Sequence, residues 1–534
     1  MELAQDEIDK SYEVKVVTKK KEALVITLLS LLIFLLAFML SGRLWFRLDM
    51  TRDGAYTISD LSRNLYREIS DRVTITYFVS PRLAASHPMP KAVADLLEEY
   101  AAHSRGRIRF IQRDPAGAGL SAVVEGLGII PWQIQVTERN ETILATVYSG
   151  ILIEYLDRED VIPLVFSLDT LEYDLTFRIR SLLRNTSRDL GIIVGDPYMD
   201  LSTDFSLLNN TLILSGFRPL LIDTGSWIPT SLPALFVLGG VESLDEYYLR
   251  PIDEYIQAGG NVLFALNGVI VDTWGSFEAR TAIDMGLLPM LANYGVLVQR
   301  ALVLDTTSLN LTFQMQGATG TQVQSVRYPP WIAVQWQGIN QNHPVSSRAL
   351  GPDFFWPSPL ELHPPQGVNA DVLFTTSREA WLQTENFITN PNTVSEFEYE
   401  RGQTRGTKIL AAALSGIFPG AFADNSTSAM NRHSRIIVAG DVNFAGPLMQ
   451  TSGSEDRNIE FFISSAIWLS GQDDLLPLRN RGSTGRLDRV TDPEARDVFM
   501  SFSRALNTFA VPLAVIIIGF IIYRKRQSMK GRQG

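Results

Sequence analysis

The chain has 534 residues, 46% of them hydrophobic, and a formal net charge of −11 at pH 7. It contains no cysteine, which excludes disulfides and thiol chemistry. Of its 47 basic and 58 acidic residues, ten basic and six acidic ones lie in segments 1–22 and 524–534, so residues 23–523 carry a net charge of −15. An acidic body of this kind argues against nucleic-acid binding.

Two apolar segments without charge, Ala23–Leu40 and Leu506–Tyr523, bracket the chain. Each is long enough to cross most of a hydrocarbon core as a helix. A cleaved signal peptide is the alternative for the first segment, but its apolar core is long and no A-x-A-like site follows. A buried core helix is the alternative for the second. We expect uncleaved transmembrane helices at residues 23–41 and 506–523.

Basic residues flank both segments on the side away from the middle of the chain: Lys19–Lys21 precede the first, and the tail 524–534 follows the second. The positive-inside rule places both flanks, and therefore both termini, in the cytoplasm. The expected location is the bacterial cytoplasmic (inner) membrane, with the middle of the chain on the periplasmic, extracytoplasmic side.

Residues 42–187 are expected to form an N-terminal α/β unit with a β-rich extension. The expected elements are a helix from an N-cap at Ser59 to about Ser70, strand Val73–Val79, helix Lys91–Ala102, strand Ile108–Gln112, strands Gln133–Val136, Thr142–Tyr148, Gly150–Tyr155 and Val161–Val165, and helix Leu171–Leu183. Strand–helix–strand with a right-handed crossover predicts a small thioredoxin-like unit. The absence of C-x-x-C excludes a redox role.

Residues 188–470 are expected to form a second α/β unit. The expected elements are strands Leu190–Val194, Leu220–Asp223, Ala234–Leu238, Asn261–Leu266, Val296–Leu304, Val372–Thr375, Lys408–Ala413 and Arg435–Ala439, and helices Leu207–Ser215, Leu244–Ala258 and Asp456–Leu469. This alternation predicts a mostly parallel sheet with helices on both faces. Residues 312–362, rich in Gln, Pro and Trp, are interpreted as an irregular insertion, and residues 471–505 as a linker.

Motifs of several enzyme classes are missing from the sequence. There is no G-x-x-x-x-G-K-[ST] for ATP hydrolysis and no G-x-S-x-G elbow. The five histidines show no metal-ligand spacing, and no H-E-x-x-H occurs. We therefore expect no catalytic residue, no cofactor and no metal site.

Three acidic residues, Asp196, Asp223 and Asp441, follow predicted strands, where α/β sites form. Capping of loops and helices by Asp is the alternative. Asn267-Gly268 also follows a strand, where a hydrolase of this layout could place a nucleophile, but Asn-Gly is ordinary turn chemistry.

Trp331, Trp336 and Trp356 are candidates for stacking against a ligand, with packing of the insertion as the alternative. A helix carrying Glu172, Tyr173, Arg178 and Arg180 is a candidate domain-interface cluster, with an ordinary solvated face as the alternative. Two histidines flank the Trp-rich stretch and are expected to be surface groups: His343 and His363.

The segment after the first apolar run carries a family resemblance. Asp49, Thr51, Tyr56, Thr57 and Ser59 resemble the D-x-T…Y-T-L-S pattern of the GldG-like family, with Ile58 where Leu is usual. Further similar segments follow in order: Leu96–Pro115, Tyr148–Tyr155, Leu171–Leu182, Ile252–Leu266, Leu302–Asp305, Gly440–Gly446 and Trp468–Gly471. The likeness spans nearly the whole chain.

This family comprises auxiliary proteins of uncharacterised ABC-type transport systems, first named for gliding motility. The resemblance implies a non-enzymatic subunit that works with a permease and a separate ATPase subunit. It also implies that the central unit is similar to class I amidotransferase-like, flavodoxin-like folds without their catalytic residues. Motility does not follow, because lineages that do not glide carry such proteins. We expect the segment from Asp49 to Ser59 to couple the body to its span or to the permease.

Two other functions stay open at this point. A membrane-tethered protein could bind glycan or peptidoglycan through the tryptophans, and an envelope glycan or lipid is a candidate partner. A divergent envelope hydrolase could use the strand-end carboxylates, provided that they are paired and their pKa values are tuned.

Overall fold

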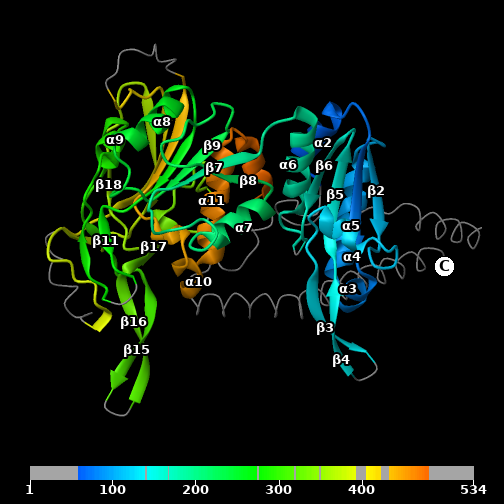
Figure 1. Cartoon of the computed structure of the whole chain (residues 1–534), viewed down its shortest axis with the longest axis horizontal. Coiled ribbons are helices and arrows are strands. Elements are labelled where there is room, and N and C mark those ends of the chain that lie inside the picture. The colour runs from blue at the N-terminus through cyan, green and yellow to red at the C-terminus, as the bar shows by residue number, and fades with distance from the viewer. Residues whose placement is uncertain are drawn as a thin grey trace, which may run out of the picture. The chain divides into compact units, whose positions relative to one another are not determined.

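The computed structural model describes residues 58–138, 141–165, 167–273, 276–317, 320–347, 350–392, 404–422 and 432–479 (Figure 1). All of them belong to one compact unit that begins at Ile58. Both predicted membrane segments lie outside these ranges. Within the described ranges, no helix combines the length and the apolarity that crossing a membrane would need.

The N-terminal lobe contains a four-stranded sheet. Its strands, in spatial order, are β2 (Ile108–Arg113), β1 (Val73–Val79), β5 (Ser149–Tyr155) and β6 (Arg158–Ile162). β1 and β2 are parallel, whereas β1–β5 and β5–β6 are antiparallel. The helices of this lobe are α2 (Asp60–Glu68), α3 (Pro81–Ser86), α4 (Met89–His103), α5 (Ser121–Gly126) and α6 (Leu171–Arg184). A separate hairpin joins β3 (Trp132–Glu138) to β4 (Glu141–Val147).

The predicted strand–helix–strand unit is confirmed. β1 is rich in β-branched and aromatic residues, and Val73, Ile75 and Tyr77 are fully buried on one face of it. Val93 and Leu97 of α4 lie one turn apart and enter the same core. The last predicted strand was placed three residues too late, since β6 begins at Arg158, which pairs with Tyr155 across a tight turn.

The C-terminal lobe contains a nine-stranded sheet with the order β13-β18-β21-β22-β10-β9-β7-β8, to which β19 adds by pairing with β21. The strands, in chain order, are β7 (Asp189–Val194), β8 (Arg218–Leu221), β9 (Ala234–Leu238), β10 (Val262–Ala265), β13 (Val296–Val298), β18 (Leu360–Leu362), β19 (Val368–Thr375), β21 (Ile409–Gly416) and β22 (Ser434–Ala439). The pairs among β22, β10, β9, β7 and β8 are parallel.

The other half of this sheet is antiparallel, so the expectation of a mostly parallel sheet was only half right. Parallel neighbours need a long crossover connection. In the described chain, α7 (Ser206–Leu214) and α8 (Glu246–Gln257) provide such crossovers, while β18, β19 and β21 follow one another without a described α-helix between them. Antiparallel neighbours need no such crossover.

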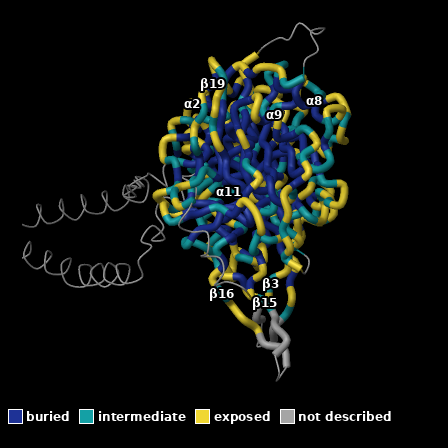
Figure 2. Tube along the Cα trace, turned by 90° about the vertical axis from the view of Figure 1, so that its left-hand side faces the viewer, coloured by how far each residue is buried: buried dark blue, intermediate teal, exposed yellow. Residues whose placement is uncertain are grey.

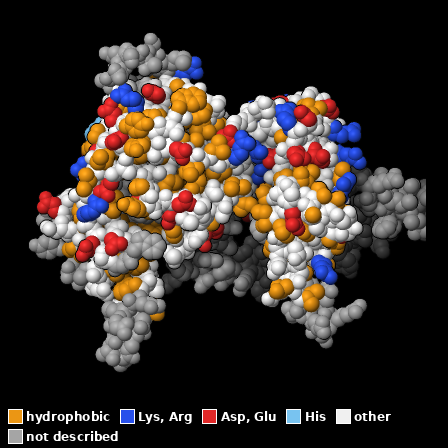
Figure 3. Space-filling view, in the orientation of Figure 1, with side chains coloured by type: hydrophobic (Ala, Val, Ile, Leu, Met, Phe, Trp, Pro, Cys, Tyr) orange, Lys and Arg blue, Asp and Glu red, His pale blue; other side chains and the backbone are white. Residues whose placement is uncertain are grey.

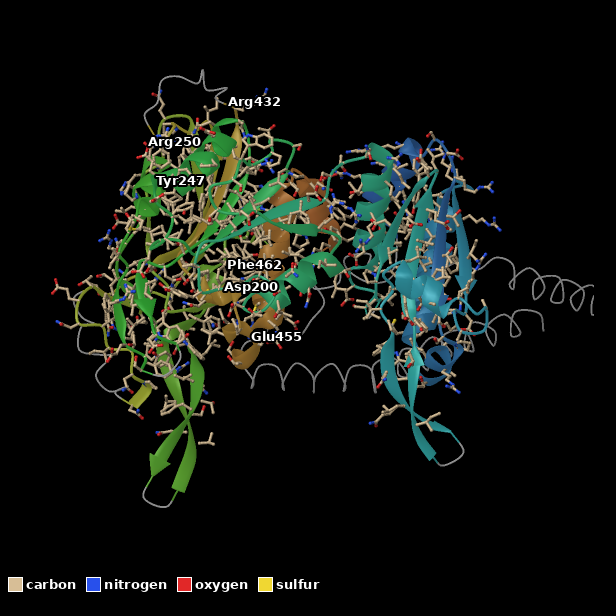
Figure 4. All side chains as sticks on the ribbon, in the orientation of Figure 1. Asp200, Tyr247, Arg250, Arg432, Glu455 and Phe462 are labelled. Carbon is tan, nitrogen blue, oxygen red and sulfur yellow. The ribbon has the colours of Figure 1, made fainter. Side chains whose placement is uncertain are left out.

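Helices cover both faces of the sheet, as predicted. Alternate residues of the parallel strands enter two different cores: Ile192 and Phe236 face one, while Ile193 and Leu235 face the other. The first core also receives α7 and α11 (Glu455–Leu469), and Figure 4 shows Phe462 of α11 in the interior. The second core receives α8 and α9 (Leu287–Asn293). The remaining α-helices of the described ranges are α10 (Leu448–Ser452) and α12 (Leu476–Arg479).

The prediction of an irregular insertion at 312–362 was wrong. A long antiparallel hairpin of β15 (Ser308–Gly317) and β16 (Gly320–Ala333) occupies much of it, and β17 (Asp353–Phe355) pairs with the end of β16. Figure 2 shows the hairpin extending from the buried interior into exposed positions. The predicted strand 296–304 divides into β13 and β14 (Leu302–Leu304), and β14 pairs with β20 (Trp381–Gln383). Two further short strands, β11 (Val269–Val271) and β12 (Ala279–Thr281), pair with each other.

Candidate functional site: a charged junction around α6

Helix α6 is shared by two hydrophobic cores. Leu175 and Ile179 enter the core of the N-terminal lobe, whereas Tyr173 and Phe177 enter the large core of the C-terminal lobe. A helix that is apolar on two faces must be covered on both. α6 therefore joins the two lobes through packing as well as through the chain.

Buried charges accompany this packing. The Arg178 side chain is 3% exposed, and its Nη1 lies 3.3 Å from Oδ1 of Asp160 on β6. Its Nη2 donates to the carbonyl of Leu214 at the end of α7, at 3.0 Å. Arg188, just before β7, places Nη1 2.6 Å from Oδ2 of the same aspartate. One buried carboxylate thus holds two arginines from consecutive elements.

The first turn of α6 holds the start of the described chain. Glu172 accepts hydrogen bonds at Oε1 from the Ser59 N–H (2.7 Å) and from the Ser62 hydroxyl (2.6 Å). Ser59 also N-caps α2, because its Oγ accepts from the Ser62 N–H at 3.1 Å. The Ser62 hydroxyl lies 2.9 Å from that of Thr176. Of the predicted coupling residues, Ser59 is fixed on α6; Asp49, Thr51, Tyr56 and Thr57 lie outside the described residues.

The last described helix also contacts α6. Contacts between α12 and α6 accompany an ion pair of Arg180 with Asp474 at 2.6 Å. Arg479, the last described residue, pairs with Glu460 of α11 at 2.9 Å, and its guanidinium carbon lies 5.3 Å from the centre of the Tyr173 ring. Both ends of the described chain therefore lie against one helix.

A cavity of about 270 Å³ opens beside this junction. Apolar side chains such as Ile162, Leu214 and Ile463 line it together with Asp174 and Arg479. Burial raises the pKa of Asp174, although the Thr170 hydroxyl donates to it at 3.0 Å. The cavity thus combines an apolar wall with an acid that is poorly solvated.

The interface interpretation of the α6 cluster is confirmed. Glu172, Tyr173 and Arg178 are buried, and Arg180 makes a contact across the junction, so a solvated face is the wrong description. The sequence contained the necessary signal, because apolar residues occupy both faces of 171–184 and leave no continuous polar face.

The carboxyl edge of the large sheet holds a second buried polar cluster. Asp441 is fully buried, and burial raises its pKa to about 7. Its Oδ2 accepts from the Phe355 N–H at 2.6 Å, and its Oδ1 accepts from the Asn443 N–H at 2.7 Å. Asn267 accepts from the Val442 N–H at 2.7 Å and donates to the Trp356 carbonyl at 3.0 Å. These side chains hold loops together.

The other strand-end aspartates have local partners. Asp196 accepts from the Tyr198 N–H at 2.9 Å, and the main-chain carbonyl of Asp223 accepts from Ser226 at 3.1 Å. Capping therefore describes Asp196 and Asp441. Among the residues that the structure describes, no group of three or more His, Asp or Glu could hold a metal ion.

The tryptophan candidates separate into two kinds. Trp331 and Trp356 are 5% and 1% exposed, and their ring centroids lie 5.6 Å apart in the large core. The Trp356 Nε1–H donates to the Tyr328 hydroxyl at 2.9 Å. The stacking prediction required a ring face exposed at the surface. Neither Trp331 nor Trp356 presents one. Trp336, on a short 3₁₀ helix, is 48% exposed.

The histidine expectation holds for one residue of two. His363 is exposed, as expected. His343 is buried instead, with its ring 5.0 Å from that of Trp468, and burial lowers its pKa. Nothing in the local sequence reveals this contact, because Trp468 lies on α11, far along the chain.

Comparison with known proteins gives the family. Residues 187–465, just over half of the chain, match the family described as an ABC-type uncharacterized transport system. This chain belongs to that family. Residues 52–154 match a domain of unknown function. An uncharacterized protein from Borreliella burgdorferi is 24% identical over 519 residues, which cover 96% of this chain and 99% of that protein.

Two solved structures show weak similarity. A ThuA-like protein from Parabacteroides merdae has a TM-score of 0.25 and 13% identity, covering 51% of this chain and 90% of its own. The exo-β-1,4-mannosidase Op5Man5 from Opitutaceae bacterium strain TAV5 has a TM-score of 0.23 and 10% identity, covering 72% and 49%. No argument about this chain rests on either.

Proposed function

We propose that this chain is a non-catalytic accessory subunit of an ABC-type transporter, of the GldG-like kind, anchored in the bacterial cytoplasmic membrane. Family membership supports the role in transport. The apolar segments at 23–41 and 506–523, with their basic flanks, support two anchors, cytoplasmic termini and an extracytoplasmic body. A permease and a separate ATPase are the expected partners, since the sequence has no P-loop motif.

The observation that carries this proposal is the convergence on α6. The described chain begins at Ile58, which is buried in the same core as Leu175, and ends at Arg479, which contacts the Tyr173 ring. Both predicted anchors therefore connect to the body beside one helix. Where the chain transmits a displacement of either span to the body, it does so next to residues that contact α6, which packs in both cores. This is a route by which a permease and the outer body could affect each other.

The strand arrangements support the finer fold assignments that belong to this proposal. A parallel pair extended by an antiparallel pair, in the order β2-β1-β5-β6, supports a thioredoxin-like N-terminal unit. Five parallel strands with helices on both faces support an amidotransferase-like, flavodoxin-like second unit. Asn267 follows β10 in that unit and is occupied in loop contacts, in line with a non-catalytic role.

The test is co-purification of the full chain with the permease and ATPase after substitution of Asp49, Thr51 and Tyr56 by Ala. We expect the complex to be lost while the melting temperature of the body is unchanged. The matched control replaces the exposed residues Asp60, Thr203 and Tyr198 by Ala, and should leave the complex intact. An undisturbed complex in the first variant would remove the coupling role of that segment. Failure of the wild-type chain to associate with either partner would remove the accessory role.

A further inference from the structure

An arginine-lined pocket lies on the N-terminal lobe, between α2 and the turn from α4 to β2. Its volume is about 800 Å³. The lining includes four arginines and one histidine: Arg63, Arg67, Arg105, Arg107 and His103. Figure 3 shows several Lys and Arg side chains, with Asp and Glu side chains between them, on the lobe that carries α2 and β2. The positive charge of the pocket lining contrasts with the net charge of −15 of residues 23–523.

The charge of this pocket is poorly neutralised. The lining described for it contains no Asp or Glu. Arg63 has Asp60 at 3.4 Å, but this pair is exposed and weak. Arg107 donates to the Tyr66 carbonyl, which is neutral. No ion pair is seen for Arg67 or Arg105 among the residues that the structure describes. Elsewhere in the chain, arginines such as Arg178, Arg280 and Arg479 pair with carboxylates.

The cationic groups stand on ordered elements. Arg63 and Arg67 are four residues apart on α2, so they share one face of the helix. Arg105 lies in a turn that Ser104 holds, because the Ser104 hydroxyl donates to the Ala101 carbonyl (2.6 Å) and accepts from the Ile108 N–H (2.9 Å). Preorganised donors lose less entropy when a ligand binds.

We propose that this pocket binds a phosphate-bearing anion. Arg67 and Arg105 would supply the direct hydrogen bonds, because the guanidinium group presents paired N–H donors that match two phosphate oxygens. Arg63 and Arg107 would add positive charge around them. The volume admits a substituted phosphate as well as the free ion. Lipid headgroups are one source, since α2 is the first described helix after the predicted span at 23–41, and soluble phosphate is the other.

The experiment titrates the full chain in a neutral detergent with two probes in separate arms. One probe is monomeric dihexanoyl phosphatidylglycerol, and the other is inorganic phosphate. The variant Arg67→Gln/Arg105→Gln removes both proposed direct donors, whose side chains are exposed. The control Arg300→Gln/Arg378→Gln removes the same charge from exposed positions outside the pocket. We expect the first variant to bind about tenfold more weakly or worse, the control to bind as wild type, and wild-type affinity to fall as salt is added.

The outcomes separate the sources. Binding of the lipid alone supports a headgroup site, binding of inorganic phosphate alone supports a soluble ligand, and binding of both supports recognition of the phosphate group itself. No binding of either probe overturns the proposal, as does equal binding by wild type and the Arg67/Arg105 variant. Each single variant, with its melting temperature measured, guards against a loss that comes from misfolding. The result is independent of whether the chain associates with a permease.

Discussion

The buried polar region around Asp441 and the one around α6 differ in how completely their hydrogen-bonding groups are satisfied. Around Asp441, both carboxylate oxygens accept main-chain N–H groups of the same lobe, one from Phe355 at the end of β17 and one from Asn443 in a 3₁₀ turn. Around α6, charges from separate elements meet beside a cavity, and Tyr173 Oη and Arg178 Nε lack a hydrogen-bond partner in the described chain. A closed network holds one arrangement, whereas an open one beside a cavity leaves room for another. We therefore expect the edge of the sheet around Asp441 to be rigid and the junction around α6 to allow more than one arrangement.

The largest expected effect tests the junction. Arg178→Met leaves Asp160 buried with only Arg188 as its partner, and should lower the free energy of unfolding by about 3–5 kcal/mol. Denaturant unfolding of the full chain measures it. Arg180→Met, two residues along the same helix, removes a pair whose acid is half exposed and should cost about 1 kcal/mol or less. Equal losses in the two variants would mean that burial of the charge is not what matters.

The next effect tests the sheet edge. Asp441→Asn replaces one acceptor oxygen by an NH₂ donor that faces a main-chain N–H. This change should lower the free energy of unfolding by about 1–3 kcal/mol at pH 5. The free energy of unfolding of the wild type should also fall by up to about 4 kcal/mol between pH 4 and 7. The reason is that the Asp441 carboxyl loses its proton near pH 4 in the unfolded chain but keeps it until about pH 7 in the folded protein.

The sign of this pH dependence follows from a raised pKa. Below about pH 4 the carboxyl is protonated in both states, and its stabilising contribution is lost as the pH rises through the folded value. Melting temperatures of wild type and Asp441→Asn at pH 5 and 7.5 give the comparison. A wild-type slope that persists in the variant would assign the titration to another group.

A smaller effect tests the attachment of the chain entry. Glu172→Ala removes the acceptor of the Ser59 N–H and the Ser62 hydroxyl, and should cost about 1–2 kcal/mol. Hydrogen exchange should increase at the start of α2, with little change in the C-terminal lobe. Glu172→Gln keeps an acceptor oxygen and should lose less. Protection of α2 that survives in the Ala variant would show that Ser59 is held by other contacts.

The smallest effect concerns the exposed pair of Glu68 and Arg184, whose Nη2 and Oε1 lie 2.8 Å apart. The hydrogen bond from Arg184 lowers the pKa of Glu68, so the pair stabilises above the usual carboxyl pKa and its contribution is lost as the pH falls through the lowered value. Because both side chains are almost half exposed, Glu68→Gln should cost no more than about 1 kcal/mol. The loss of stability caused by Glu68→Gln should vanish in high salt. A loss that persists in high salt would indicate that Glu68 stabilises the protein by packing and not by its charge.

Elements with a strong local pattern were predicted well. The bounds of Val73–Val79 and Ala234–Leu238 match the structure, because a buried, β-branched run with turn residues beside it has few alternatives. The hairpin of β15 and β16 was missed because the prediction weighed the Gln, Pro and Trp content of residues 312–362 above the local pattern. The signal was present, since polar and apolar residues alternate from Ser308 to Gln316 in β15. The candidate sites were harder still. The exposure of Trp331, Trp356 and His343 depends on partners far along the chain, which no local pattern reports.

The sequence by itself determined the acidic body, the absence of cysteine chemistry, the order of most elements and the resemblance to transport auxiliary proteins. These properties depend on composition and on contacts within a few residues. Only the tertiary structure decided that α6 is a junction and that Arg67 of α2 and Arg105 of a distant turn share one pocket. Those arrangements arise when remote segments bury apolar surface together, and the positions of the charged groups follow from that packing.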